Sequence, residues 1–142
     1  MNIKIVYATK TKHSRKIAQA IANGFNIQAE NYLNNPKLED VDLLFLVSGI
    51  YGGVSDPKFL QYVASLNPSS IRIAAVVTNS AGGTFASEGV RQTLKDAGIV
   101  VYPEAFICRG AFLFFYMGHP NQTDLESAVA YAHRVREAIS GQ

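Results

Sequence analysis

The sequence has little cysteine: one residue among 142, together with no tryptophan. A single cysteine cannot form a disulfide within the chain, which excludes a disulfide-stabilised secreted module and suits the reducing cytoplasm. Long hydrophobic runs are also missing, because no apolar stretch approaches the roughly 20 residues that a membrane-spanning helix needs. A strand pattern starts within the first few residues, so we expect no signal peptide. These absences predict a cytoplasmic protein without a transmembrane segment.

An excess of charge of one sign is absent as well. The 13 lysine and arginine residues and 11 aspartate and glutamate residues give a net charge of +2. That charge is too small, without a patterned basic face, to predict nucleic-acid binding. The histidines, at positions 13, 119 and 133, do not have the spacing of metal ligands. The composition is that of an ordinary globular chain, and its length predicts one domain over residues 1–142, as a monomer or weak dimer.

What the sequence does contain is an alternation of strand and helix patterns. Apolar strand patterns cover residues 2–8, 26–31, 41–48, 71–78 and 99–108, and helical periodicity covers about 13–24, 57–66, 85–96 and 123–139. Residues 32–40 indicate a loop with one helical turn. Alternating strands and helices predict an α/β fold: a doubly wound, five-stranded parallel sheet of order 2-1-3-4-5, in a three-layer α/β/α arrangement.

Several residues indicate where these elements begin and end. Gly24 and Gly98 are expected to end their helices, since glycine accepts the left-handed conformation common at helix ends. Asp56–Pro57 predicts an N-cap followed by the first helical residue. Thr123–Glu126 has the pattern of a capping box that opens the C-terminal helix. Pro103 interrupts the last strand and therefore predicts that it lies at the edge of the sheet.

A polar turn, Thr9–Ser14, joins the first strand to the first helix. The first N–H groups of a helix have no acceptor within it, and hydroxyl side chains can add donors, so such a turn binds anions. Hydroxyls come from three of its residues, and basic side chains surround them: Lys10, Lys12, His13, Arg15 and Lys16. Cations are unfavourable in the first turn of a helix unless an anion lies nearby. We therefore predict a phosphate-binding turn; the alternative is a hydroxyl-rich helix cap without a ligand.

Two further loops follow strands of the predicted sheet. Gly49–Gly53 follows the third strand, and its glycines allow positive φ and close approach of a ligand. Asn79–Thr84 follows the fourth strand. In the predicted order all three loops meet at the carboxyl ends of adjacent strands, where open α/β sheets bind ligands. Their convergence is the strongest functional signal in the sequence.

These motifs resemble those of the flavodoxin family. The family's phosphate loop is a hydroxyl residue, any residue, Thr, Gly, any residue, then Thr or Ser, and this sequence has Thr9-Lys10-Thr11-Lys12-His13-Ser14. The similarity continues through the Gly49–Gly53 and Thr78–Thr84 loops and the segments Phe106–Gly110 and Gly118–Pro120, in the short-chain form. The resemblance implies a flavodoxin-like fold, bound FMN, and one-electron transfer in which the flavin itself does the redox chemistry.

The resemblance also implies which residues hold the FMN. Thr9, Thr11 and Ser14, with the backbone of residues 10, 12 and 13, would hold its phosphate. Tyr51 would lie against the flavin ring, Gly52 would face the flavin N5, and the loop from Asn79 would meet the pyrimidine end of the ring. No catalytic side chain is required. The complete implied cofactor-binding set is Thr9, Lys10, Thr11, Lys12, His13, Ser14, Gly49, Ile50, Tyr51, Gly52, Gly53, Thr78, Asn79, Ser80, Gly82 and Gly83.

The sequence departs from the family's pattern in four places. Lys12 stands where the phosphate loop has glycine, and the phosphate end is unusually basic. Gly53–Ser55 stands where carboxylates commonly line the flavin, and no aromatic residue lies in 79–83. These differences bear on the partner proteins more than on the cofactor.

Three interpretations of the function remain open. The first is an electron carrier between an unidentified reductase and an acceptor protein. The second is an FMN-dependent specialist, either an activator of the manganese ribonucleotide reductase or a small oxidoreductase with its own substrate. The third is a cofactor-free binding module on the same fold. A phosphoryl-accepting receiver domain is excluded, because Ala8–Thr9 and Val47–Gly49 lack the carboxylates that it needs.

Two apolar features complete the expectations. Cys108 lies on a predicted strand, which indicates an inert buried thiol. The segment 111–117 is expected to be mostly buried core; if exposed, it would form a patch for a partner or a dimer interface.

Overall fold

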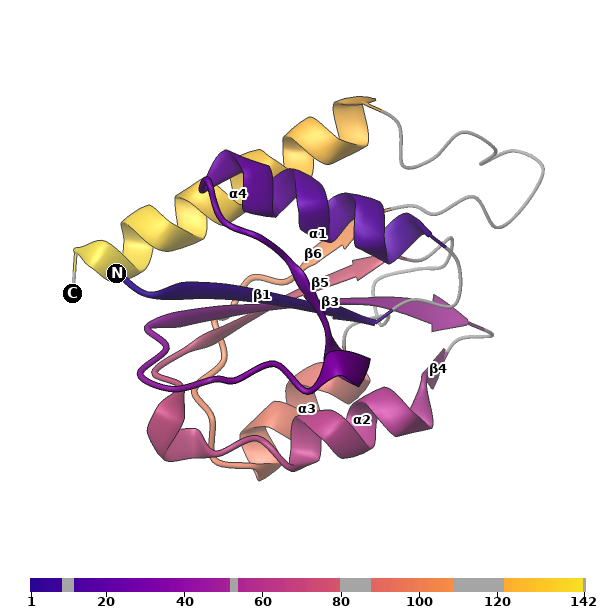
Figure 1. Ribbon diagram of the computed structural model, residues 1–142, viewed down its shortest axis with the longest axis vertical. Coiled ribbons are helices and arrows are strands. Elements are labelled where there is room, and N and C mark those ends of the chain that lie inside the picture. Colours follow the sequence, from indigo (N-terminus) through magenta and orange to yellow (C-terminus); the bar gives the residue numbers. More distant parts are fainter. Residues whose placement is uncertain (9–11, 52–53, 80–87, 109–121, 142) are drawn as a thin grey trace.

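A parallel sheet forms the centre of the molecule (Figure 1). The computed structural model describes residues 1–8, 12–51, 54–79, 88–108 and 122–141. Within them the parallel strands follow the order β2-β1-β3-β5-β6, and β4 pairs antiparallel with the end of β3. This is the predicted 2-1-3-4-5 order, with one short strand added. The strands are β1 (Ile3–Ala8), β2 (Glu30–Asn31), β3 (Leu43–Tyr51), β4 (Val54–Ser55), β5 (Ala74–Asn79) and β6 (Phe106–Cys108).

Helices cover both faces of the sheet, which confirms the predicted three layers (Figure 1). One face carries α1 (His13–Gly24) and α4 (Gln122–Ser140). The other face carries α2 (Pro57–Ala64) and α3 (Glu88–Asp96). Short 3₁₀ turns lie at Tyr32–Asn34, inside the predicted 32–40 loop, and at Pro68–Ser70.

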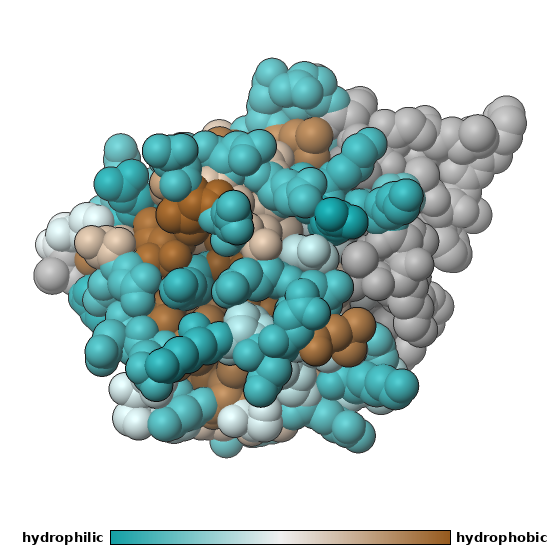
Figure 2. All heavy atoms as spheres, in the orientation of Figure 1, coloured by the Kyte–Doolittle hydropathy of each residue, from teal (hydrophilic) through white to brown (hydrophobic). Residues whose placement is uncertain are grey.

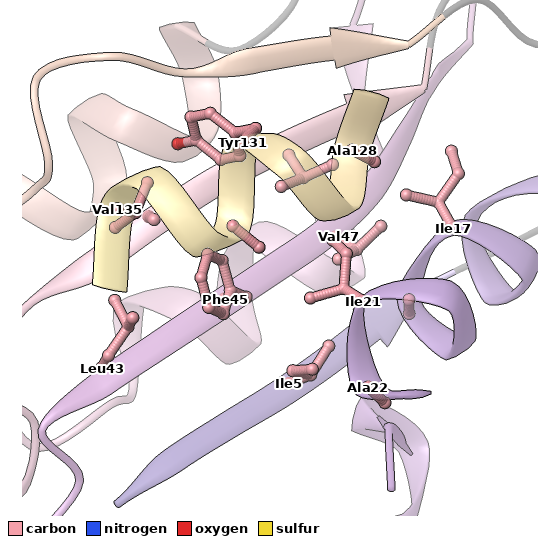
Figure 3. Close-up of a cluster of buried hydrophobic side chains, with 14 of the residues drawn as sticks. Ile5, Ile17, Ile21, Ala22, Leu43, Phe45, Val47, Ala128, Tyr131 and Val135 are labelled. Carbon is pink, nitrogen blue, oxygen red and sulfur yellow. The ribbon is translucent and has the colours of Figure 1, made fainter. Parts of the chain in front are cut away.

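The alternation of side chains along β3 divides the core into two halves. Leu43, Phe45 and Val47 point toward α1 and α4, where they meet the buried Tyr131 of α4 (Figure 3). Leu44 and Leu46 point to the opposite face, toward α2 and α3. Because both faces are buried, the strand is apolar at every position from 43 to 47, as expected for a central parallel strand.

As predicted, α1 ends at Gly24, but the expected left-handed glycine is not the reason. Gly24 does not adopt positive φ; the left-handed residue is Asn26, with φ of 59°. The amide of Ile27 donates to the Ala22 carbonyl, closing a Schellman motif around Asn26. A Cβ atom on Gly24 would lie 2.8 Å from Cγ1 of Val129, so this glycine is needed for the close approach of α1 and α4.

Two other helix boundaries were predicted correctly. Asp56 caps α2, because its carboxylate accepts a hydrogen bond from the Lys58 amide at 3.1 Å, and Pro57 is the first helical residue. Gly98, two residues after the end of α3, has φ of 85°, and the amide of Ile99 donates to the Leu94 carbonyl. Both ends therefore have the backbone geometry that their residues favour.

Three boundaries differ from the predictions. The capping box is wrong: α4 already includes Gln122, so Thr123 lies inside the first turn, and the Gln122 amide donates to the Glu126 carboxylate at 3.3 Å. The second strand is shorter than 26–31, because only Glu30–Asn31 pair with β1. The last strand pairs as β6 over three residues and as an isolated bridge at Val101, with Pro103 between them at the sheet edge, as predicted.

Hydrophilic side chains cover most of the face shown in Figure 2, with apolar areas between them. Large apolar side chains exposed in the described ranges are scattered singly: Met1, Leu33 and Val100. In those ranges no helix combines the length and apolar character that crossing a membrane requires.

Packing of α1 on α4 yields the first prediction. Gly24→Ala should lower the free energy of unfolding by about 1 kcal/mol, because the added methyl overlaps the stiff β-branched side chain of Val129. In a Val129→Ala background the same substitution should be neutral or stabilising, since alanine favours a helix over glycine by about 1 kcal/mol. Urea denaturation of the four proteins measures the coupling. An equal effect in both backgrounds would show that the two positions do not clash.

Candidate functional site

The candidate site is the edge of the sheet where three adjacent parallel strands end. Ala8 of β1 pairs with Ser48 of β3, which pairs with Thr78 of β5. One position further on, Gly49 pairs with Asn79. The strands that precede the three predicted loops therefore end at the same edge of the sheet, as the predicted strand order requires.

The buried polar side chains that the structure describes gather at this edge. All the polar residues classed as buried in the described ranges lie here: Ser14, Ser48 and Thr78. Their hydroxyl oxygens have no hydrogen-bond partner among the described residues. The Tyr62 hydroxyl on α2 and the Arg91 Nε on α3 also lack a partner among the described residues, whereas the Tyr131 hydroxyl donates to the Glu104 carbonyl. Hydroxyls buried without partners are costly, so this edge has the polar character expected of a binding site.

The start of α1 fits an anion. Lys12 is the N-cap residue and makes no side-chain capping hydrogen bond. Its φ of −87° is an ordinary backbone conformation, so the missing loop glycine causes no strain at this position. Ser14 is fully buried in the first turn, close to helix amides that have no acceptor within the helix. No acidic residue lies in that turn.

Positive charge surrounds this helix start without being neutralised by neighbours in the described ranges. Lys12, Arg15 and Lys16 are exposed, and none of the ion pairs among described residues includes them. Burial, and secondarily the charge of Lys16, lowers the pKa of His13 below its usual value. The imidazole is therefore biased toward its neutral form near pH 7, while the exposed cations keep the helix start positive.

The glycine loop after the third strand was predicted partly incorrectly. Gly49, Ile50 and Tyr51 are not loop residues; they extend β3, where Tyr51 pairs with Val54 and Ile50 with Ser55 of β4. Antiparallel pairing with β4 keeps the end of β3 in an extended conformation. Asn79 likewise ends β5 and does not begin a loop.

Ser48 is a candidate site residue that the loop motifs do not include. It directly follows a run of five apolar residues, 43–47. The sequence signal for this residue is a single polar side chain after a buried apolar run, one position before a glycine. Thr78, which was predicted, occupies the equivalent position in β5.

Many of the predicted residues cannot be compared with the structure. Of the implied cofactor-binding set, Thr9, Lys10, Thr11, Gly52, Gly53, Ser80, Gly82 and Gly83 lie outside the described residues, as do the segment 111–117 and His119. The side chains of Ile50, Tyr51, Asn79 and Cys108 are also outside the description, although their backbones belong to strands. The roles implied for these residues stay predictions.

A separate hollow lies at the opposite, amino edge of the sheet. A cavity of about 460 Å³ is lined by the start of β1, the segment after α1 and the end of α4, where the Arg136 guanidinium lies 5.7 Å from the Phe25 ring centre. The described part of the chain holds no group of three or more histidine, cysteine, aspartate or glutamate residues that could bind a metal ion.

No protein-family model matches the sequence, and no curated protein matches it either. Solved structures do. An archaeal flavodoxin superposes with a TM-score of 0.77 and 16% identity, covering 99% of each chain. The general stress protein 14 of Treponema denticola, solved in complex with FMN, gives 0.62 and 14%, covering 97% of this chain and 99% of that one. An NAD(P)H:quinone oxidoreductase of Methanothermobacter marburgensis gives 0.62 and 12%, covering 95% and 98%.

This chain has the flavodoxin-like fold. The resemblance expected from the loop motifs is confirmed at the level of the fold, over nearly the whole length of the chain. The carboxyl edge of β1, β3 and β5 is the topological switch point of such a sheet, because β1 and β3 are neighbours whose connections run to opposite faces.

The unpartnered hydroxyl of Ser14 leads to a prediction that needs no cofactor. Ser14→Ala should raise the free energy of unfolding of the ligand-free protein by about 1 kcal/mol, because it removes an unsatisfied buried hydroxyl and improves helix propensity. Inorganic phosphate should raise the melting temperature of the unmodified protein more than that of the variant. Ser127→Ala, on an exposed position of α4, is the matched control. A variant stabilised by phosphate as strongly as the unmodified protein would exclude Ser14 from the anion site.

Proposed function

We propose that this protein binds FMN at the carboxyl edge of β1, β3 and β5 and acts in electron transfer. The observation that carries the proposal is the presence at that edge of three buried hydroxyls without partners, one on α1 and two on the neighbouring strands β3 and β5. A protein keeps such groups dry and unpaired where a ligand completes their hydrogen bonds. The flavodoxin-like fold supports the same site, since ligands of open α/β sheets bind at the switch point.

The residues at the start of α1 fit the phosphate of FMN. The Ser14 hydroxyl and the first-turn amides of α1 would donate hydrogen bonds to it, with the hydroxyls of Thr9 and Thr11 implied by the loop motif. Exposed Lys12 and Lys16 add positive charge, and the first turn contains no carboxylate to repel a dianion. The basic character of this end is therefore matched to the ligand's charge.

The other end of the site would hold the flavin ring. Tyr51 is proposed to lie against the ring and the peptide around Gly52 to face its N5, next to the described pairing of Tyr51 with Val54. Backbone groups after Asn79 would meet the pyrimidine edge. Bound FMN supplies the electron-accepting chemistry, and the chain's own residues bind it, orient it and limit its contact with water.

The proposed role is that of an electron carrier between two partner proteins. Reductase and acceptor proteins in the cytoplasm are the proposed partners, consistent with a chain of one cysteine. The alternative is an FMN-dependent specialist, a ribonucleotide-reductase activator or a small oxidoreductase; one structural neighbour is itself an NAD(P)H:quinone oxidoreductase. The electron carrier and the FMN-dependent specialist can be distinguished by how the bound flavin takes up electrons.

The test is a visible absorption spectrum of the purified protein, before and after addition of FMN, followed through stepwise reduction. We expect flavin bands that red-shift or sharpen on binding, and a one-electron-reduced flavin that accumulates midway. FMN should bind about 10- to 100-fold more tightly than riboflavin, because only FMN carries the phosphate that forms charge-assisted hydrogen bonds.

Passage of the flavin straight to the two-electron state would favour the oxidoreductase. A colourless protein that FMN does not reconstitute would contradict the proposal and leave the cofactor-free binding module. Equal affinity for FMN and riboflavin would show that the Thr9–Ser14 turn does not bind the phosphate.

A further inference from the structure

The edge of β1 is covered by β2 over only part of its length. Although β1 pairs with β3 from Ile3 to Ala8, it pairs with β2 only at Val6 and Tyr7. The chain that leaves α1 crosses β1 at an angle before it reaches β2 (Figure 1). Among the described residues, no backbone hydrogen bond joins 25–29 to β1. The first half of β1 therefore has no strand partner on this side.

The backbone groups of this open stretch point toward its uncovered side. The Asn2 carbonyl accepts a hydrogen bond from the Leu43 amide of β3 at 3.2 Å. Successive residues of a strand direct their N–H and C=O groups to opposite sides, so those of Ile3 point away from β3. At about 3.3 Å per residue, the stretch Ile3–Ile5 is roughly 10 Å long. A row of unpaired main-chain groups is a template for pairing with another chain.

A hollow separates the open stretch from the chain that leaves α1. Its volume of about 460 Å³ lies in the range of about 300–1,000 Å³ that is typical of ligand sites. The ring of Phe25 in its wall is stacked on the buried Phe45, with ring centres 5.9 Å apart. The other lining residues that matter here are Ile3, Lys4, Ile27, Glu30 and Arg136. An open strand edge and an apolar wall thus lie on one cavity.

Two cations flank the hollow from opposite faces of the sheet. Lys4 alternates with Ile3 and Ile5, which pack toward α1 and α4, so its side chain lies on the α2 and α3 face. Arg136 comes from α4 on the other face. None of the ion pairs among the described residues includes either side chain. Among the lining side chains the carboxylate is that of Glu30, at the end of the hollow where β2 begins.

We propose that this edge binds an extended acidic segment of a partner protein, which is added to the sheet beside Ile3–Ile5. Main-chain hydrogen bonds to an open edge give such a segment its affinity, and side-chain contacts give selectivity. Neighbouring side chains of an extended segment point to opposite faces, so two consecutive acidic residues place one carboxylate near Arg136 and the other near Lys4. FMN plays no part in this binding, because its proposed site lies at the opposite edge of the sheet.

Short synthetic peptides test the proposal on the full chain, without an N-terminal tag. The probe is acetyl-Val-Glu-Glu-Val-amide, with the Gln-Gln peptide as its neutral match, and glutarate carries two carboxylates without a peptide backbone. Amide chemical shifts of ¹⁵N-labelled protein follow each titration. We expect shifts centred on Ile3–Ile5 and an affinity for the acidic peptide about 4- to 25-fold higher than for the neutral one. The peptide should also slow hydrogen exchange of the Ile3 amide, and glutarate should not.

Two charge variants test the roles of the cations. Lys4→Gln and Arg136→Gln should each weaken binding of the acidic peptide about 2- to 5-fold and leave the neutral peptide unaffected, because each removes one ion pair. The matched control is Arg134→Gln, which makes the same charge change on α4 at a guanidinium that already pairs with Glu104 at 3.1 Å. This control should bind the acidic peptide as tightly as the unmodified protein.

The acidic preference, its reduction in both variants and slower exchange at Ile3 would together support the proposal. Equal affinities for the two peptides would overturn it and show that the cations only shield the edge from other strands. Glutarate binding as tightly as the peptide, with exchange at Ile3 unchanged, would make the hollow a small-anion site instead. Shifts at Ile3–Ile5 that depend on protein concentration alone would make a second copy of the chain the occupant. Absence of shifts at millimolar peptide would overturn strand addition and leave FMN binding untouched.

Discussion

Parallel pairing of β1, β3 and β5 is the constraint on which the rest of the structure depends. Parallel neighbours end at one edge, and near that edge Ala8, Ser48 and Thr78 pair in one row. Both faces of these strands are covered by helices, so polar groups in that row are cut off from water. Ser48 and Thr78 are therefore buried by the same geometry that brings the loops together.

Helix packing supports this edge from both sides. On one face α1 approaches α4 closely because Gly24 has no side chain, and α1 also packs against β1. On the other face α2 begins at an Asp56 cap directly after β4. Two helices thus begin near the edge where the strands end.

Much of the fold follows from local signals. Continuous apolar runs such as 43–47 require burial on both faces, and helical periodicity between such runs leaves a doubly wound parallel sheet as the simple solution. The predictions that were wrong concerned residues whose conformation depends on contacts between distant segments. Gly24 acts through its neighbour Val129, and Gly49 stays in a strand because β4 and β5 pair with its segment, neither of which a local pattern can reveal. The buried state of Ser48 likewise follows from register and not from its own neighbours in the sequence.

Amide chemical-shift mapping with ¹⁵N-labelled protein locates where FMN binds. If it binds at the carboxyl edge of β1, β3 and β5, the largest shifts on addition of FMN should be at Lys12–Arg15, Gly49–Tyr51 and Thr78–Asn79. Amides at the amino edge, such as Ile27 beside the separate cavity, should not move. Shifts confined to that cavity, or the absence of shifts at saturating FMN, would contradict the account.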